Sequence, residues 1–222
     1  MILWAAVRLL FTALLGICLS ARGEDVPATM TRLMVKVESP DIAKDSFAAQ
    51  AKRILRAGSG YCRIEENPDL ANGIHGLLIT NEPDSWMINR LDKTARHFVD
   101  QGPTFNCRLP IFGNSDEIKS AKDANRPLMR LEFGREFEFF KEKSGPPHPG
   151  PVMQGKETKV YSADWEGWHL FLFTSGQPEI PVAVVRKNEK TRDIIWYGEY
   201  LELPFDPQLF AKPNDVKIEE VR

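Results

Sequence analysis

The sequence predicts an α+β protein built on one large, curved and mostly antiparallel β-sheet, with a helix covering its open side. Two observations predict this class. Short segments in which apolar and polar residues alternate follow one another along the chain, separated by tight turns of Gly, Pro, Asn and Asp. One central segment, Pro127–Lys143, instead repeats its apolar residues at helical spacing.

The first residues form a segment that is typical of export. Arg8 supplies positive charge, and Leu9–Leu19 is an uncharged apolar run shorter than the roughly 20 residues that a membrane-spanning helix needs. Small residues follow up to Gly23, so we expect a cleaved signal peptide over residues 1–23. Two alternatives stay open: lipidation at Cys18 and an uncleaved anchor. A periplasmic or secreted protein with no transmembrane segment after cleavage is the expectation.

Composition predicts one globular domain, residues 24–222, that does not bind nucleic acid. The chain has 222 residues, with 29 basic and 31 acidic side chains and a formal net charge of −2. No basic stripe is present that could follow a phosphate backbone.

Two cysteines remain after the signal peptide, Cys62 and Cys107. In an oxidising compartment an even pair indicates a disulfide. Such a bond would contribute roughly 3–4 kcal/mol in the chain-entropy model. Two free thiols are the alternative.

The first half of the domain predicts an antiparallel meander, because short strands follow one another through tight turns. Gly58-Ser59-Gly60 is a hairpin signal between two of them. The expected strands are Thr31–Glu38, Ala51–Gly58, Tyr61–Pro68, Gly76–Thr80, Trp86–Arg90 and Thr94–Val99.

The middle of the chain predicts helices near residues 114–143. Asn114 and Glu117 resemble a capping box for a helix that ends near Ala124. Pro127 then opens the second helix, whose apolar stripe is Met129, Phe133, Phe137 and Phe140.

Three residues of this second helix carry further expectations. Gly134 costs about 1 kcal/mol relative to Ala in a helix and indicates a close approach to the sheet. Glu132 and Glu136 are spaced to share one exposed face, where we expect them to be solvated.

The second half of the domain predicts another run of strands after the stiff segment Ser144–Val152. Both faces of "WHLFLF" are apolar, which indicates a strand covered on both sides. A sheet of this size must curl or close to protect its edges. The expected strands are Thr158–Ala163, Trp168–Phe173, Ile180–Arg186 and Asp193–Leu203.

The C-terminal tail predicts an ordered closure of the sheet. Pro204 and Pro207 form a corner, and Leu209-Phe210 is an apolar plug that follows it. We expect the last strand, near Val216–Ile218, to pair back onto the sheet.

Three stretches of the second half resemble the LolA/LolB-like superfamily of periplasmic lipoprotein carriers: "GKETKVYSA", "GQPEIPVAVVRKN" and "YGEYLELPFDPQLFAKPNDVKI". The basic strand pair and the apolar meander of the first half are similar to those of small secreted relatives. The resemblance implies a half-open barrel with a helical lid and an apolar cavity between them, which carriers use for acyl chains. None of these stretches is a catalytic motif.

The expected function is therefore binding of a lipid or other apolar ligand, or of lipoprotein acyl chains, with no catalysis and no cofactor. A lipoprotein or another envelope protein is a further candidate partner. The candidate lining residues on strands and helix are Trp86, Ile88, Met129, Phe133, Phe137, Phe140, Leu170 and Leu172.

Two alternatives stay open. The same fold with a filled core would serve as a secreted interaction or scaffold protein. An envelope hydrolase is a third hypothesis, although no nucleophile elbow, zinc motif or phosphate loop occurs. We expect no metal site, because no two histidines have the spacing of a ligand pair. The nearest approach to such a pair is His97 with Asp100.

Overall fold

The computed structural model describes residues 26–44, 46, 49–99, 107, 131–165 and 167–221. The expected signal peptide, the expected helix at 114–124 and the expected helix start at Pro127 lie outside the described residues. The described strands form one sheet in the order β12-β6-β5-β4-β3-β2-β1-β11-β10-β9-β8-β7. The strands are β1 (Thr29–Glu38), β2 (Lys52–Ala57), β3 (Tyr61–Glu65), β4 (Gly76–Asn81), β5 (Asp84–Asn89), β6 (Thr94–Val99), β7 (His148–Pro149), β8 (Lys159–Trp165), β9 (Trp168–Ser175), β10 (Ile180–Lys187), β11 (Arg192–Pro204) and β12 (Lys217–Glu220).

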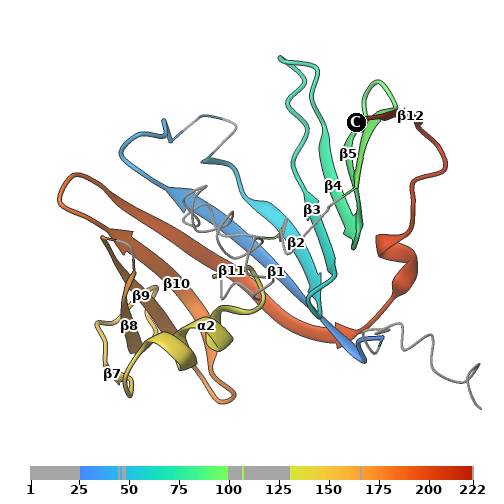
Figure 1. The fold of residues 1–222 in the computed structure, drawn as a ribbon. Coiled ribbons are helices and arrows are strands. Elements are labelled where there is room, and N and C mark those ends of the chain that lie inside the picture. Colours follow the sequence, from blue (N-terminus) through green and yellow to red (C-terminus); the bar gives the residue numbers. More distant parts are fainter. Residues whose placement is uncertain are drawn as a thin grey trace, which may run out of the picture.

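The sheet consists of two antiparallel meanders that are joined at the centre. Strands β1 to β6 pair in sequence order, and so do β7 to β11. The first strand then pairs with the last long one, β1 with β11, and closes the two meanders into one sheet. Figure 1 shows β3–β5 and β8–β10 at opposite ends of the curved sheet, with β1 and β11 crossing between them. The prediction of a curved, mostly antiparallel sheet is confirmed, and the described strands do not close into a ring.

The pairing of β1 with β11 contains a β-bulge at Gly198. Met34 lies opposite Glu199 and Val35 lies opposite Tyr197, so Gly198 is the extra residue. An extra residue shifts the alternation of side chains by one position. Tyr197 and Tyr200 therefore both pack into the same core cluster, although three positions separate them.

The helix α2 (Glu136–Lys143) begins later than the sequence predicts. Residues 131–135 are not helical, so Phe133 lies before the helix. Gly134 has φ +79, a left-handed conformation that ends any helix reaching it. A Cβ at Gly134 would lie 2.9 Å from the Cβ of Arg56 on β2, so the expected close approach to the sheet is confirmed.

The main core lies between α2 and the sheet and contains the disulfide Cys62–Cys107. The two Cα atoms are 5.8 Å apart, and both side chains are fully buried. The disulfide expected from the cysteine count is therefore confirmed.

The two faces of "WHLFLF", which we expected to be covered alike, differ in burial among the residues that the structure describes. Leu170 and Leu172 are fully buried on the core face of β9, whereas Phe171 and Phe173 on the other face are half-buried. Both faces of the strand are apolar in sequence, but α2 covers only one of them.

The C-terminal tail returns to the far edge of the sheet, as the sequence predicts. The 3-10 turn η2 (Pro207–Phe210) is capped by the Asp206 side chain, which accepts a hydrogen bond from the backbone N–H of Gln208. Phe210 is fully buried, and its ring centroid lies 5.5 Å from that of Tyr61. Strand β12 then pairs with β6 in parallel, the one parallel pair among the described strands.

We predict that deleting residues 206–222 destabilises the domain. The deletion removes the buried Phe210 and uncovers the apolar cluster against which Val216 and Ile218 pack. Loss of a buried Phe alone lowers the free energy of unfolding by about 3–5 kcal/mol. Urea denaturation and size-exclusion chromatography measure the effect, with deletion of Val221 and Arg222 alone as the control. A 206–222 deletion that stays monomeric with unchanged stability would contradict this account of the tail.

Candidate functional site

The structure gathers five of the expected lining residues around α2. Phe133, Phe140, Leu170 and Leu172 belong to the main core, and Phe137 packs at its margin against Tyr161. Phe140, Leu170 and Leu172 have no exposed surface. A side chain without exposed surface touches no space that a water molecule could enter, so the volume around these three residues is filled.

The other expected lining residues lie elsewhere. Trp86 and Ile88 belong to a separate apolar cluster on β4, β5 and β6, which the tail residues Val216 and Ile218 cover. Met129 lies outside the described residues. The sheet therefore does not bring Trp86 and Ile88 to the core beneath α2, because its two ends carry separate clusters.

Glu136 is buried, which corrects the expectation that it lies on an exposed helix face. It is the first residue of α2 and has no exposed surface. Its carboxylate accepts hydrogen bonds from the Tyr197 hydroxyl at 2.8 Å, the Tyr200 hydroxyl at 3.2 Å and the Gly134 N–H at 2.9 Å. The bulge at Gly198 makes this arrangement, since it turns both tyrosines toward the same face.

Burial raises the pKa of Glu136 to about 7, because an ionised carboxylate loses its hydration in the core. Its hydrogen bonds, including the one from Tyr197, favour the ionised form and only partly oppose that effect. Burial also raises the pKa of Tyr197 and Tyr200, and the neighbouring Glu136 raises both further. The group is thus a buried acid held by two phenols that stay protonated.

Glu132 is also buried, against expectation, and forms an ion pair with Arg56 of β2. The carboxylate oxygen lies 2.5 Å from a guanidinium nitrogen, and the two side chains are 3% and 2% exposed. Arg56 also donates to the backbone carbonyls of Ser59, at 2.7 Å, and Tyr61, at 3.3 Å. Burial lowers the pKa of Arg56, and the charge of Glu132 opposes this shift.

These two buried groups fasten the segment before α2 onto the centre of the sheet. Sequence reasoning missed them because helical spacing predicts which residues share a face, not which face the core covers. The signal in the sequence is the presence of two acids within an apolar segment. If such acids are buried, they need hydrogen-bond or charge partners. No solute reaches Glu136, so its position supports a structural role.

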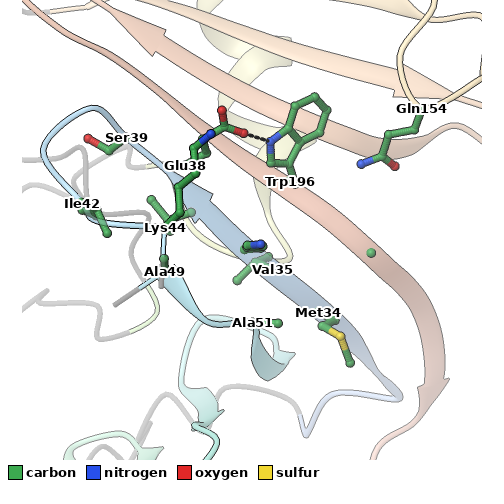
Figure 2. A pocket seen from close by; sticks show the side chains of 13 residues that line it. Met34, Val35, Glu38, Ser39, Ile42, Lys44, Ala49, Ala51, Gln154 and Trp196 are labelled. Carbon is green, nitrogen blue, oxygen red and sulfur yellow. Dashed lines mark hydrogen bonds between the residues drawn. The ribbon is translucent and has the colours of Figure 1, made fainter. Parts of the chain in front are cut away.

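An open groove lies beside the central strand pair (Figure 2). It has a volume of about 490 Å³. Apolar side chains dominate its lining, and the indole N–H of Trp196 donates to the Glu38 carboxylate at 3.0 Å. The lining residues are Met34, Val35, Lys36, Val37, Glu38, Ser39, Ile42, Lys44, Ala49, Ala51, Gln154, Trp196 and Gly198.

A second apolar groove, of about 470 Å³, lies over β3 to β6. Met87 and Ile74 line it, and they are 56% and 42% exposed. Ile88, one of the expected lining residues, also borders this groove.

Of His97 and Asp100, the nearest approach to a ligand pair in the sequence, the structure describes only His97. The ring of His97 contacts the carboxylates of Glu220 on β12 and Asp84 on β5, the latter at 2.7 Å. The hydrogen bond with Glu220 raises the pKa of His97, and the bond with Asp84 adds to the shift. Among the side chains that the structure describes, no group of three His, Cys, Asp or Glu residues is placed to hold a metal ion.

No protein-family model matches the sequence, and no curated protein matches it either. Among solved structures, the chain is similar to an uncharacterized conserved protein from Thermus thermophilus, with 10% sequence identity and a TM-score of 0.49. That alignment covers 87% of this chain and 91% of the other. Two crystal forms of PNGF-II align at 9% identity with 87% of this chain, with TM-scores of 0.32 and 0.30. The chain spans 31% and 32% of the length of PNGF-II in these two alignments.

Within the described part of the chain, no helix has the length and apolar character needed to cross a membrane.

We predict that the pH dependence of stability changes when Glu136 is replaced by Gln. A carboxyl whose pKa rises from 4.5 to about 7 on folding stabilises the protein below pH 4.5, and this stabilisation is lost as the pH rises through 7. The wild type should therefore lose about 3 kcal/mol relative to E136Q between about pH 4 and pH 8. Urea denaturation at both pH values measures the difference. Equal pH dependence of the two proteins would contradict a carboxyl that loses its charge on folding.

We further predict that Glu132→Gln lowers the free energy of unfolding by about 3–5 kcal/mol, because it leaves the Arg56 charge buried without its partner. The double variant R56M/E132L should regain much of this loss, since it removes both charges. Glu138→Gln is the matched control: it breaks the exposed pair with Arg135 and should change stability by less than about 1 kcal/mol. If E132Q and E138Q were equally mild, the buried pair would not fasten this segment to the sheet.

Proposed function

We propose that this is an exported protein of the cell envelope that binds a lipid or another apolar ligand and performs no catalysis. In this proposal the protein is periplasmic or secreted, and its fold is of the LolA-like kind, with the sheet as one wall of a half-open barrel and α2 as its lid. The observation that carries the proposal is the open apolar groove beside β1 and β11 (Figure 2).

The position of the ligand differs from the one that the sequence suggests. The space around Phe140, Leu170 and Leu172 is filled, so a ligand there would have to displace core side chains. The groove at Trp196, in contrast, is open and needs no such displacement.

The size of the groove fits a small apolar ligand. Ligand pockets typically measure about 300–1,000 Å³, and this one measures about 490 Å³. Burying about ten methylene groups contributes about 8 kcal/mol, before the loss of ligand freedom is subtracted. Affinity in the micromolar range or weaker is therefore the expectation.

A second candidate function is that of a secreted interaction or scaffold protein without a ligand. The filled core beneath α2 favours it, because a carrier that stores acyl chains under its lid would keep that volume open. The two candidates differ in whether any apolar compound binds the purified protein.

We predict that N-phenyl-1-naphthylamine, a neutral apolar dye that fluoresces in apolar sites, binds the purified protein. Met34→Lys places a charge in the groove and should weaken binding by about tenfold or more, since burying an unpaired charge is unfavourable. Met87→Lys is the matched control, because Met87 lies in the second groove.

Native mass spectrometry of gently purified protein, before and after incubation with membrane extract, complements the dye titration. Absence of dye binding and of any retained lipid would favour the scaffold function. Dye binding that only Met87→Lys weakens would move the ligand to the second groove and contradict the proposed site.

A further inference from the structure

The tail encloses a third opening, on a different part of the sheet from the groove of Figure 2. Its volume is about 620 Å³, and it lies between the segment that follows η2 and strands β3 to β6. One wall is apolar and the rim is basic. The apolar residues are Leu77, Ile79, Ile88 and Val216, the basic ones are Arg63, Arg90, Lys93 and Lys212, and Asp215 is the one acid of the lining.

The tail segment over this opening is held at both ends. At one end Phe210 is buried in its own cluster, and the backbone carbonyl of Leu209 accepts a hydrogen bond from Arg63 at 2.9 Å. At the other end the N–H of Lys217 donates to the carbonyl of Lys93 at 2.8 Å, where β12 starts to pair with β6. Residues 211–216 run between these anchors, and Figure 1 shows the red tail passing beside β3–β5.

The four cations of the lining fall into two pairs. Arg63 and Arg90 are partly neutralised by Glu65, at 2.8 Å and 3.4 Å. Lys93 and Lys212 form no ion pair with any residue that the structure describes. They come from two different segments, Lys93 from the turn between β5 and β6 and Lys212 from the tail.

This concentration of positive charge does not follow from the composition of the chain, whose net charge is −2. The lining holds four cations and the acid Asp215, and Glu65 beside it partly neutralises two of the cations, so the opening keeps a positive charge in a protein that is acidic overall. Like charges that border one opening repel each other, and a bound anion would offset that repulsion and accept charge-assisted hydrogen bonds.

We propose that this opening binds an amphipathic anion, a phosphate or carboxylate head carrying an alkyl chain. The head lies between Lys93 and Lys212, and the chain lies on Leu77, Ile79 and Ile88. These three residues are 4–7% exposed and Val216 and Ile218 pack against their cluster, so the alkyl chain contacts only the part of this floor that the tail leaves uncovered. This site is independent of the proposed function, because the two openings share no lining residue.

Dodecyl phosphate below its micelle concentration is the probe, and isothermal titration calorimetry of the full mature chain is the measurement. Inorganic phosphate and dodecyl maltoside test the head and the chain separately, and both should bind at least about tenfold more weakly. Binding of dodecyl phosphate should also weaken as NaCl rises from about 50 to 500 mM, because salt screens the charges.

Charge variants test the site itself. The double variant K93Q/K212Q should lose about tenfold or more in affinity. Asp215→Asn removes the one acid of the lining and should bind more tightly than the wild type. The matched control is K156Q/K190Q, which removes two exposed lysines elsewhere and should leave the affinity unchanged.

Each of the following outcomes would contradict the proposal. Equal affinity for inorganic phosphate would mean that the alkyl chain is not recognised, and equal affinity for dodecyl maltoside would mean that the anion is not. A K93Q/K212Q variant that binds like K156Q/K190Q would place the probe elsewhere. If dodecyl phosphate binding responds to Met34→Lys instead, the probe occupies the groove of Figure 2, and only the present proposal fails.

Discussion

The pairing of β1 with β11 is the interaction on which the rest of the structure depends. It joins residues near the two ends of the domain, from Thr29 opposite Pro204 to Glu38 opposite Ile194, and so makes one sheet of two meanders. The bulge at Gly198 within this pairing turns Tyr197 and Tyr200 to the same face, where both hold Glu136. The start of α2, and with it the cover of the main core, therefore follows from the register of the two central strands.

The filled core and the open grooves lie in different parts of the molecule. Beneath α2 the apolar side chains are packed without access to solvent, and the buried pair Arg56–Glu132 ties the preceding segment to β2. Open volume lies outside this core, beside Trp196, over β3 to β6 and beneath the tail. A protein organised in this way can bind small molecules without opening its core. The grooves that could take a ligand therefore lie outside the core and not beneath the helix.

Much of the fold could be predicted from the sequence, and the site could be predicted far less. Alternating segments such as Thr31–Glu38 and the turn residues between them locate the strands because both signals are local. The stripe that includes Phe133 and Phe137 predicted a helix that runs through Gly134, but the backbone there is left-handed and the helix begins only at Glu136. Glu132 and Glu136 have the spacing of solvated helix residues and are nevertheless buried, because their partners Arg56, Tyr197 and Tyr200 come from distant strands.

The sequence by itself determined the strands and the tight turns between them, the antiparallel order within each meander, the ordered tail and an even number of cysteines in the domain. Each of these depends on neighbouring residues or on a simple count. The tertiary structure alone decided which end of the sheet α2 covers. It also placed Trp86 and Ile88 in a different cluster from Leu170 and Leu172. Finally, it brought Lys93 and Lys212 to the lining of one opening. These facts depend on the curvature of the sheet and on contacts between residues far apart in the chain. Periodicity shows that a face is apolar, but only packing shows what covers it.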